Sequence, residues 1–132
     1  MKESEIRDAF YTRHLLSFMN LTHKDLKVIS KEFPIMTEDG KKRIDLLLQE
    51  NTTDNSGSFL VLEFKRKRVD VGAVEQLERY CTNVEKRLYS KKKASGFLVA
   101  QEFSQFEVQM ATQFGHKCVR YSPATGLMDV MN

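Results

Sequence analysis

Hydrophobic positions along the chain fall into stripes and short runs that predict alternating helices and strands. Residues 4–19 carry apolar side chains at helical spacing, with a break in the stripe at Arg13-His14. The Glu38-Asp39-Gly40 segment is typical of a tight hairpin turn. Apolar runs on either side of it, and one farther along the chain, predict strands at 26–35, 42–49 and 58–66. We therefore expect a helix followed by an antiparallel meander of three strands.

The second half of the chain returns to helical spacing. Asp70 can cap a helix over residues 71–89, whose apolar positions recur three and four residues apart. A basic loop at 89–93 precedes a strand at 95–100, and the apolar middle of that strand indicates burial on both faces.

The last elements are shorter. A helix is predicted over residues 102–114, through Phe103, Phe106, Met110 and Phe114, with Gly115 as its stop. A short strand is expected at 117–121, and a weakly ordered tail at 122–132. The order αβββαβαβ indicates an α/β fold in which a mixed central sheet is flanked by helices.

Length and composition indicate one domain over residues 1–132. The chain has 41% hydrophobic and 30% charged residues, as is ordinary for a globular protein. No apolar run approaches the length of a membrane span, and the first residues lack the apolar segment of a signal peptide. We therefore expect a cytoplasmic location and no membrane partner. The two cysteines and three histidines show no metal-binding spacing.

Charge is distributed unevenly. The whole chain carries +3, but residues 65–93 hold ten basic and four acidic side chains, so this segment is +6 and the remaining 103 residues are −3. A basic block on a nearly neutral body favours a face that meets a polyanion such as DNA. A solvated helix surface would explain the same charges without any partner.

Three charged residues interrupt the apolar strands. Glu63 and Lys65 end the run Phe59-Leu60-Val61-Leu62-Glu63-Phe64-Lys65, and Asp45 lies within the strand before it. Alternation along a strand puts Glu63 and Lys65 on one face, and it puts Asp45 on the opposite face from Ile44. If the two strands pair across the 51–57 loop, Asp45 and Glu63 come close on the same side.

Two close carboxylates with a backbone carbonyl make an oxygen site that suits Mg²⁺ or Mn²⁺. The carbonyl of Phe64 is the natural third ligand, and Lys65 can stabilise charge on a reacting phosphate. Other interpretations stay open, because Glu-x-Lys also occurs by chance at exposed strand ends. Asp45 could equally pair with Arg43 or with a cation on a helix.

The set Asp45, Glu63 and Lys65, in this order of elements, resembles the PD-(D/E)xK nuclease superfamily and its restriction-endonuclease-like αβββαβ core. Glu75-Gln76-Leu77-Glu78-Arg79-Tyr80 is similar to the QxxxY helix motif of RecB-type nucleases. Over roughly residues 4–121 the chain resembles the catalytic domain of the archaeal and actinobacterial mismatch-specific endonucleases, the NucS/EndoMS type. Those enzymes carry a further DNA-binding and dimerisation domain, for which 132 residues leave no room.

The resemblance implies roles for particular residues. Asp45 and Glu63 would be metal ligands, Lys65 the catalytic lysine, and Gln76 and Tyr80 would face the scissile phosphate. The family often adds an acid from the first helix, for which Glu5 is the expected residue, with Glu3 and Asp8 as competitors. The side chains expected to contact DNA are Arg43, Lys67, Arg68, Arg79, Lys91, Lys92 and Lys93.

The expected activity is metal-dependent hydrolysis of DNA, as in DNA repair, recombination or mobile elements. A homodimer, or a partner protein that supplies specificity, is a reasonable hypothesis because cutting both strands needs two centres. A Holliday-junction or branched-DNA resolvase of the same superfamily is the enzymatic alternative. The other rivals are a nucleic-acid-binding module that does not cut, and a structural protein with a fortuitous Glu-x-Lys.

Overall fold

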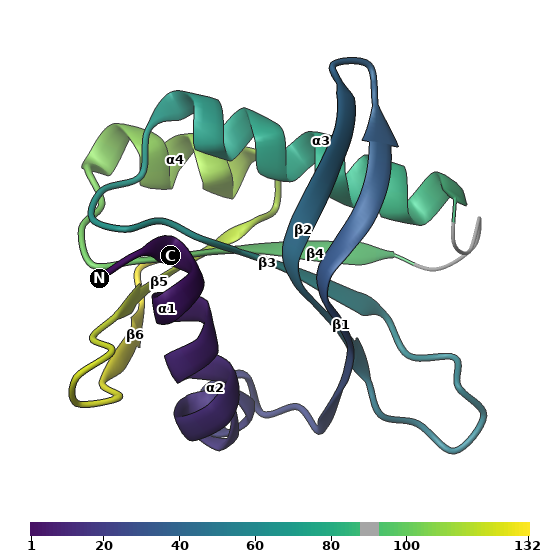
Figure 1. The fold of residues 1–132 in the computed structure, drawn as a ribbon, viewed down its shortest axis with the longest axis horizontal. Coiled ribbons are helices and arrows are strands. Elements are labelled where there is room, and N and C mark those ends of the chain that lie inside the picture. Colours follow the sequence, from purple (N-terminus) through teal and green to yellow (C-terminus); the bar gives the residue numbers. More distant parts are fainter. Residues whose placement is uncertain (88–92) are drawn as a thin grey trace.

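The computed structural model describes residues 1–87 and 93–132 (Figure 1). The chain opens with α1 (Glu3–Ala9), the π-helical turn η1 (Phe10–His14) and α2 (Leu15–Thr22). Three strands follow, β1 (Leu26–Thr37), β2 (Gly40–Glu50) and β3 (Phe59–Phe64). The remaining elements are α3 (Val71–Arg87), β4 (Ala94–Ala100), α4 (Gln105–Gln113), β5 (Lys117–Tyr121) and β6 (Met128–Val130). The end of the predicted helix 71–89 and most of the predicted basic loop lie outside the described residues.

The described strands form one six-stranded sheet in the order β1-β2-β3-β4-β5-β6. The first three strands are antiparallel, β3, β4 and β5 are parallel, and β6 returns antiparallel to β5. The predicted mixed sheet and the αβββαβ order are confirmed. β3 is the strand at which antiparallel pairing changes to parallel pairing, and it is buried along its whole length.

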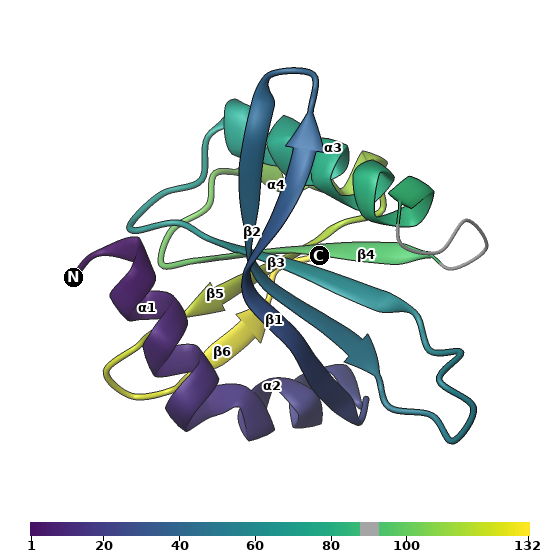
Figure 2. The same cartoon turned by 45° about the vertical axis from the view of Figure 1, so that its right-hand side comes forward.

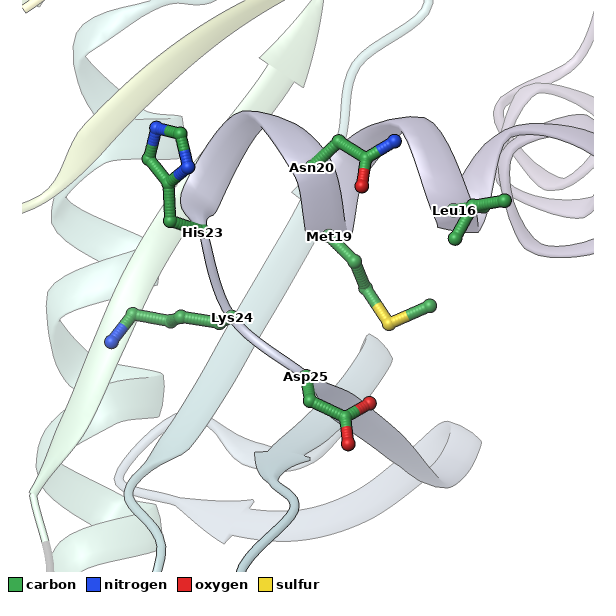
Figure 3. A pocket seen from close by; sticks show the side chains of 6 residues that line it. All are labelled: Leu16, Met19, Asn20, His23, Lys24 and Asp25. Atoms are coloured by element: carbon green, nitrogen blue, oxygen red, sulfur yellow. The ribbon is translucent and has the colours of Figure 1, made fainter.

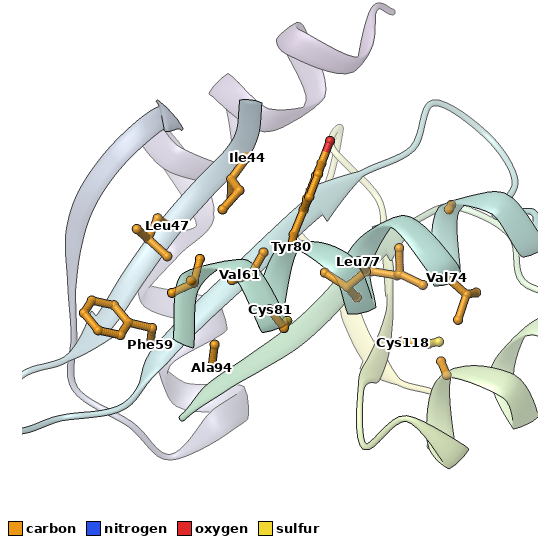
Figure 4. Close-up of a cluster of buried hydrophobic side chains, with 14 of the residues drawn as sticks. Ile44, Leu47, Phe59, Val61, Val74, Leu77, Tyr80, Cys81, Ala94 and Cys118 are labelled. Carbon is orange, nitrogen blue, oxygen red and sulfur yellow. The ribbon is translucent and has the colours of Figure 1, made fainter. Parts of the chain in front are cut away.

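The sheet separates two apolar layers (Figures 1 and 2). On one face α1, η1 and α2 cover a cluster that contains Phe10, Phe18 and Phe64. On the other face α3 and α4 cover a cluster that includes Val61, Leu77 and Tyr80 (Figure 4). No helix among the described residues is long and apolar enough to cross a membrane.

The predicted single helix 4–19 is three consecutive segments and extends to Thr22. Its apolar stripe breaks at Arg13-His14 because the π-helical turn widens the helix there. Phe10, at the start of that turn, is fully buried, and its ring packs edge-on against Phe18, Phe64 and Tyr121. The contacts of the Phe10 ring with three other aromatic rings stabilise the π-helical turn in place of a regular α-helix.

The hairpin of β1 and β2 is longer than the sheet needs. β2 pairs with β1 from Gly40 to Glu50 but with β3 only from Leu46 to Gln49, so the outer part of the hairpin extends beyond the sheet beside α3. Residues 33–44, at the tip of this projection, are called the hairpin arm below (Figures 1 and 2). The predicted Asp-Gly turn is confirmed, with Gly40 at φ +102°.

Strict alternation fails at Ile44. We expected Ile44 on the face of Leu46 and Leu48, but it packs in the α3-side cluster together with Leu47. Asp45 follows Ile44, at the point where β2 passes from the hairpin arm into the sheet. Its side chain accepts a hydrogen bond from the Phe64 amide at the end of β3.

Two expectations near the end of the chain were wrong. Phe103 and Met110 pack against the α3-side cluster as predicted, but Phe106 and Phe114 are 64% and 41% exposed, and Ala111 is buried in their place. The expected weakly ordered tail contains β6, which pairs with β5. The side chain of Asn132 accepts a hydrogen bond from the Cys118 amide at 2.7 Å and donates to the His116 carbonyl at 2.8 Å.

Candidate active site

Asp45 and Glu63 lie directly opposite each other where β2 joins β3. Leu46 is paired with Leu62, and the same register places Asp45 opposite Glu63. The Asp45 amide donates to Glu63 Oε1 at 3.0 Å, and the Phe64 amide donates to Asp45 Oδ2 at 2.8 Å. Each carboxylate therefore receives a backbone hydrogen bond from the other strand. The expectation that pairing across the 51–57 loop brings the two acids together is confirmed.

Burial dominates the electrostatics of this pair. Glu63 is only 5% exposed, and burial together with the neighbouring charge of Asp45 raises its pKa well above the ordinary value. Burial also raises the pKa of Asp45, although the Phe64 amide opposes this change. A hydrogen bond between the two carboxyl groups lowers the pKa of Asp45 and raises that of Glu63. The pair therefore retains a proton more strongly than isolated carboxyl groups do, with Glu63 as its donor.

Lys65 lies beside the two acids, as its place on the strand predicts. Its positive charge lowers the pKa of both Asp45 and Glu63, although less than burial raises them. The Lys65 amide donates to the Val99 carbonyl at 2.9 Å, which fixes the backbone beyond β3 to the parallel strand β4. Its side chain is half-buried at the edge of the site.

Tyr80 brings helix α3 to the same site. It is 3% exposed, and burial and the charges of Glu63 and Asp45 raise its pKa to about 12. A hydrogen bond from Gln76 and the charge of Arg79 act in the opposite direction. Tyr80 is therefore a neutral hydroxyl that faces the acids, and Gln76 is its direct partner. Figure 4 shows its hydroxyl at the edge of the apolar cluster.

The first helix contributes an acid different from the expected one. Glu5 accepts a hydrogen bond from the Lys2 amide at 2.9 Å, so it caps the start of its own helix. Glu3 instead accepts from the Arg66 amide at 3.1 Å, just beyond Lys65, and its charge raises the pKa of Asp45. Glu3, one of the two competitors in the sequence, is the acid that the fold brings to the site.

The basic residues predicted to contact DNA do not form one group. Lys67 and Arg68 are exposed immediately after β3, and Arg79 lies near Tyr80 on α3. Arg43 lies on the hairpin arm. Lys93 is at the opposite end of β3, where its carbonyl accepts from the Phe59 amide at 2.9 Å. Lys91 and Lys92 lie outside the described residues.

The donor set fits a hard divalent cation. Among residues 1–87 and 93–132, no three His, Cys, Asp or Glu side chains gather into a metal site, so side chains alone do not fill a coordination sphere. Two carboxylates that otherwise share a proton, with a backbone carbonyl beside them, are the kind of partial shell that Mg²⁺ completes with water and phosphate. The Phe64 carbonyl stays the predicted third ligand.

A separate hollow lies between α2 and the start of β1 (Figure 3). It measures about 350 Å³ and is lined by Leu16, Met19, Asn20, His23, Lys24 and Asp25. It includes neither Asp45 nor Glu63, and its charged side chains are of both signs. Nothing in its chemistry connects it with the paired acids.

Comparison with known proteins gives one family and several solved relatives. The profile of the endonuclease NucS C-terminal domain matches residues 4–132. Endonuclease NucS from Methanocaldococcus jannaschii is 29% identical over 107 residues, which cover 81% of this chain and 37% of that protein.

The solved structures show the same fold. A repair endonuclease from Pyrococcus abyssi superposes with a TM-score of 0.63 at 24% identity, covering 83% of this chain and 46% of that one. A complex of EndoMS with double-stranded DNA gives 0.61 at 24% identity, covering 83% and 44%. The chain thus spans less than half the length of these relatives.

Proposed function

Because this chain belongs to the endonuclease NucS C-terminal domain family, we propose that it is the nuclease domain of a DNA endonuclease of the PD-(D/E)xK type. It hydrolyses phosphodiester bonds with Mg²⁺ or Mn²⁺ as cofactor. The observation that carries the proposal is the pair of Asp45 and Glu63, whose carboxyl groups each accept a hydrogen bond from a backbone amide of the other strand, with Lys65 just beyond Glu63. The relatives that share the fold are described as endonucleases, one of them in complex with double-stranded DNA.

Asp45, Glu63 and the Phe64 carbonyl would hold the cation. When bound, the cation supplies a polarised phosphate oxygen and an activated water. Both carboxyl groups would hold the cation in their ionised form, so binding of the cation would compete with protons at Asp45 and Glu63. Their backbone hydrogen bonds hold both carboxylates in place before the cation arrives.

Other side chains act on the phosphate. Lys65 offsets the negative charge that develops at phosphorus, because its ammonium is a compact charge on a flexible stem. Tyr80 stays protonated at neutral pH, so it can donate a hydrogen bond to a phosphate oxygen, and Gln76 orients its hydroxyl. Glu3 has the role first expected for Glu5. Its carboxylate accepts a hydrogen bond from the Arg66 amide and adds negative charge beside Asp45.

Lys67 and Arg68 follow Lys65 in the chain, Arg79 precedes Tyr80 on α3, and all three would contact the DNA backbone. Phosphate contacts give affinity but no sequence readout, so specificity has to come from elsewhere. The longer relatives contain additional chain, and a homodimer or a partner protein is the expected source here.

Nicking of supercoiled plasmid tests the proposal. With Mg²⁺ or Mn²⁺ the wild-type chain should nick, and Glu63→Gln and Lys65→Ala should each lose about 100-fold or more in rate. Glu5→Gln is the matched control, since Glu5 only caps α1, and it should nick at nearly the wild-type rate.

Equal nicking by wild type and Glu63→Gln would show that the site assignment is wrong. Mismatched, branched, flap and single-stranded DNA tested in parallel distinguish a mismatch enzyme from a resolvase. DNA binding that survives EDTA, with no cleavage of any substrate in Mn²⁺, would favour a module that binds without cutting.

A further inference from the structure

A basic groove lies between the hairpin arm and the end of helix α3. It has a volume of about 390 Å³, and the side chains that line it are of only two kinds. The cations are Lys41, Lys42, Arg43 and Arg87, and the apolar floor includes Ile35 and Met36. Only Arg43 of these cations was expected to contact DNA from the sequence.

The groove is built on a fixed frame. Lys42 and Arg43 are paired across the hairpin with Ile35 and Pro34, and Ile35 is buried in the α3-side cluster. The Asn83 side chain donates to the Met36 carbonyl at 2.6 Å and so ties the arm to α3. Arg87 is the last residue of α3 and approaches the arm from the helix side.

The two hollows between the arm and α3 differ in charge. A second hollow, also formed by the arm and α3, is lined by Glu38 and Glu78 as well as Arg79 and Lys86, so its charges balance. No carboxylate is among the described residues that line the groove, and its four cations repel one another. A run of like charges over an apolar floor is stabilised by an anionic partner that covers it.

The position of the groove relative to Asp45 indicates which anion fits. Asp45 follows Lys42 by three residues on β2, a distance of ~10 Å along a strand. One DNA strand advances ~3.4 Å along its axis for each phosphate. A DNA strand that runs along β2 with its scissile phosphate at Asp45 would therefore bring a phosphate about three nucleotides away into the groove.

We propose that this groove binds the phosphodiester backbone of the cleaved DNA at about the third phosphate from the scissile bond. This inference rests on the proposed nuclease function, because it uses the paired acids to place the strand. The arm then acts as a clamp that aligns the DNA, and Lys42 and Arg87 contribute to affinity without reading sequence.

The test measures binding of the whole chain to a short DNA duplex in EDTA, where no cleavage takes place. The double variant Lys42→Ala/Arg87→Ala should weaken binding about 10-fold or more near 0.1 M salt, and should lower the slope of log K against log salt by about one to two. Lys24→Ala, which removes one positive charge outside the groove, is the control. Lys24 pairs with Glu50 at 2.7 Å at the other end of the hairpin, and its loss should change affinity less than about twofold.

A neutral phosphate locates the contact. A methylphosphonate at the third position should weaken wild-type binding and leave the double variant unaffected, whereas one placed far from the scissile bond should weaken both equally. If the double variant melts at a lower temperature, Lys41→Ala/Arg87→Ala replaces it, since both of these side chains are exposed.

The outcomes separate the two proposals. If both double variants bind DNA with the wild-type affinity and salt slope, the groove does not bind DNA, even if plasmid nicking succeeds. Absence of nicking together with weakened binding in the variants would overturn the nuclease and leave the groove as a DNA-binding surface.

Discussion

At the scale of single residues, the fold places two carboxyl groups where burial disfavours the ionised form of each. Glu63 ends a strand of otherwise apolar side chains, and its burial beside Asp45 disfavours its charge. The structure offsets this cost only in part, through the two backbone amides and Lys65. The proposed divalent cation would offset the remaining cost, because its charge favours the ionised form of both carboxyl groups.

Stability of the metal-free protein should therefore depend on pH. The folded pKa of Glu63 is raised above its ordinary value of 4.5, so its contribution to stability is complete below that pH and is lost as the pH rises through the folded pKa. Glu63→Gln removes the buried charge, so it should be more stable than wild type in the metal-free protein at pH 8, and this gain should shrink towards pH 5. Chemical denaturation at pH 5 and pH 8 measures this.

Glu75→Gln is the matched control, because Glu75 is exposed on α3 and its loss should leave the pH dependence unchanged. A variant Glu63→Gln that is less stable than wild type at pH 8 would contradict the electrostatic account.

Metal binding should appear as stabilisation. Mg²⁺ or Mn²⁺ at 100 times its dissociation constant should stabilise wild type by ~2.7 kcal/mol, and Asp45→Asn should lose most of this effect. The stabilisation should weaken as the pH falls, because protons compete for both carboxylates. Thermal melting with and without the cation is the measurement, and an equal shift in Asp45→Asn would place the cation elsewhere.

At the scale of elements, packing decides the details that periodicity misses. η1 departs from the α-helical repeat to bury Phe10, α4 turns its exposed aromatic side chains outward, and β6 adds a last strand to the sheet. In each case the local pattern is weak and contacts with distant elements dominate. The end of the chain is the clearest example, because the Asn132 side chain forms hydrogen bonds with Cys118 of β5 and with His116 in the loop before it.

Asn132→Ala should destabilise the fold by about 1–2 kcal/mol, since it leaves the buried Cys118 amide without its partner. Met131→Ala is the control, because the Met131 backbone amide, which donates to the Cys118 carbonyl, is unchanged. Urea unfolding of the two variants measures the difference. Equal stability of Asn132→Ala and wild type would indicate that this end of the chain contributes nothing to the fold.

At the scale of the whole molecule, one sheet carries every proposed function. The paired acids lie on β2 and β3, the lysine follows β3, and α3 places Tyr80 from one side while α1 places Glu3 from the other. The hairpin arm extends the same strand β2 outward into the basic groove. Under the proposed function, each chain would offer one reactive centre with a single direction of approach along the DNA.

One centre per chain should cut one strand at a time. Plasmid cleavage should accumulate nicked circles before linear product, and the rate of linear formation should rise more steeply with protein concentration than the rate of nicking. Gel analysis over a concentration series measures both rates. Linear product that forms without a nicked intermediate at the lowest concentrations would indicate a preformed pair of centres.

The sequence by itself determined the order of strands and helices from β1 to β5, the pairing of β2 with β3 and the meeting of Asp45 with Glu63. These follow from strong local signals: alternation along short strands, the Asp-Gly turn, and charged residues that interrupt apolar runs. Gln76 and Tyr80 came from the motif resemblance, and the fold places Tyr80 at the acids.

The tertiary structure alone decided which acid of the first helix reaches the site, which face α4 buries, and how the arm meets α3. Glu3 and Glu5 are chemically alike and two residues apart, and only the position of α1 against the end of β3 separates them. Likewise Lys42 and Arg87 are 45 residues apart in the sequence and share the groove only because the arm folds onto α3. Local patterns fix the elements, whereas contacts between distant elements fix which of several similar side chains come together.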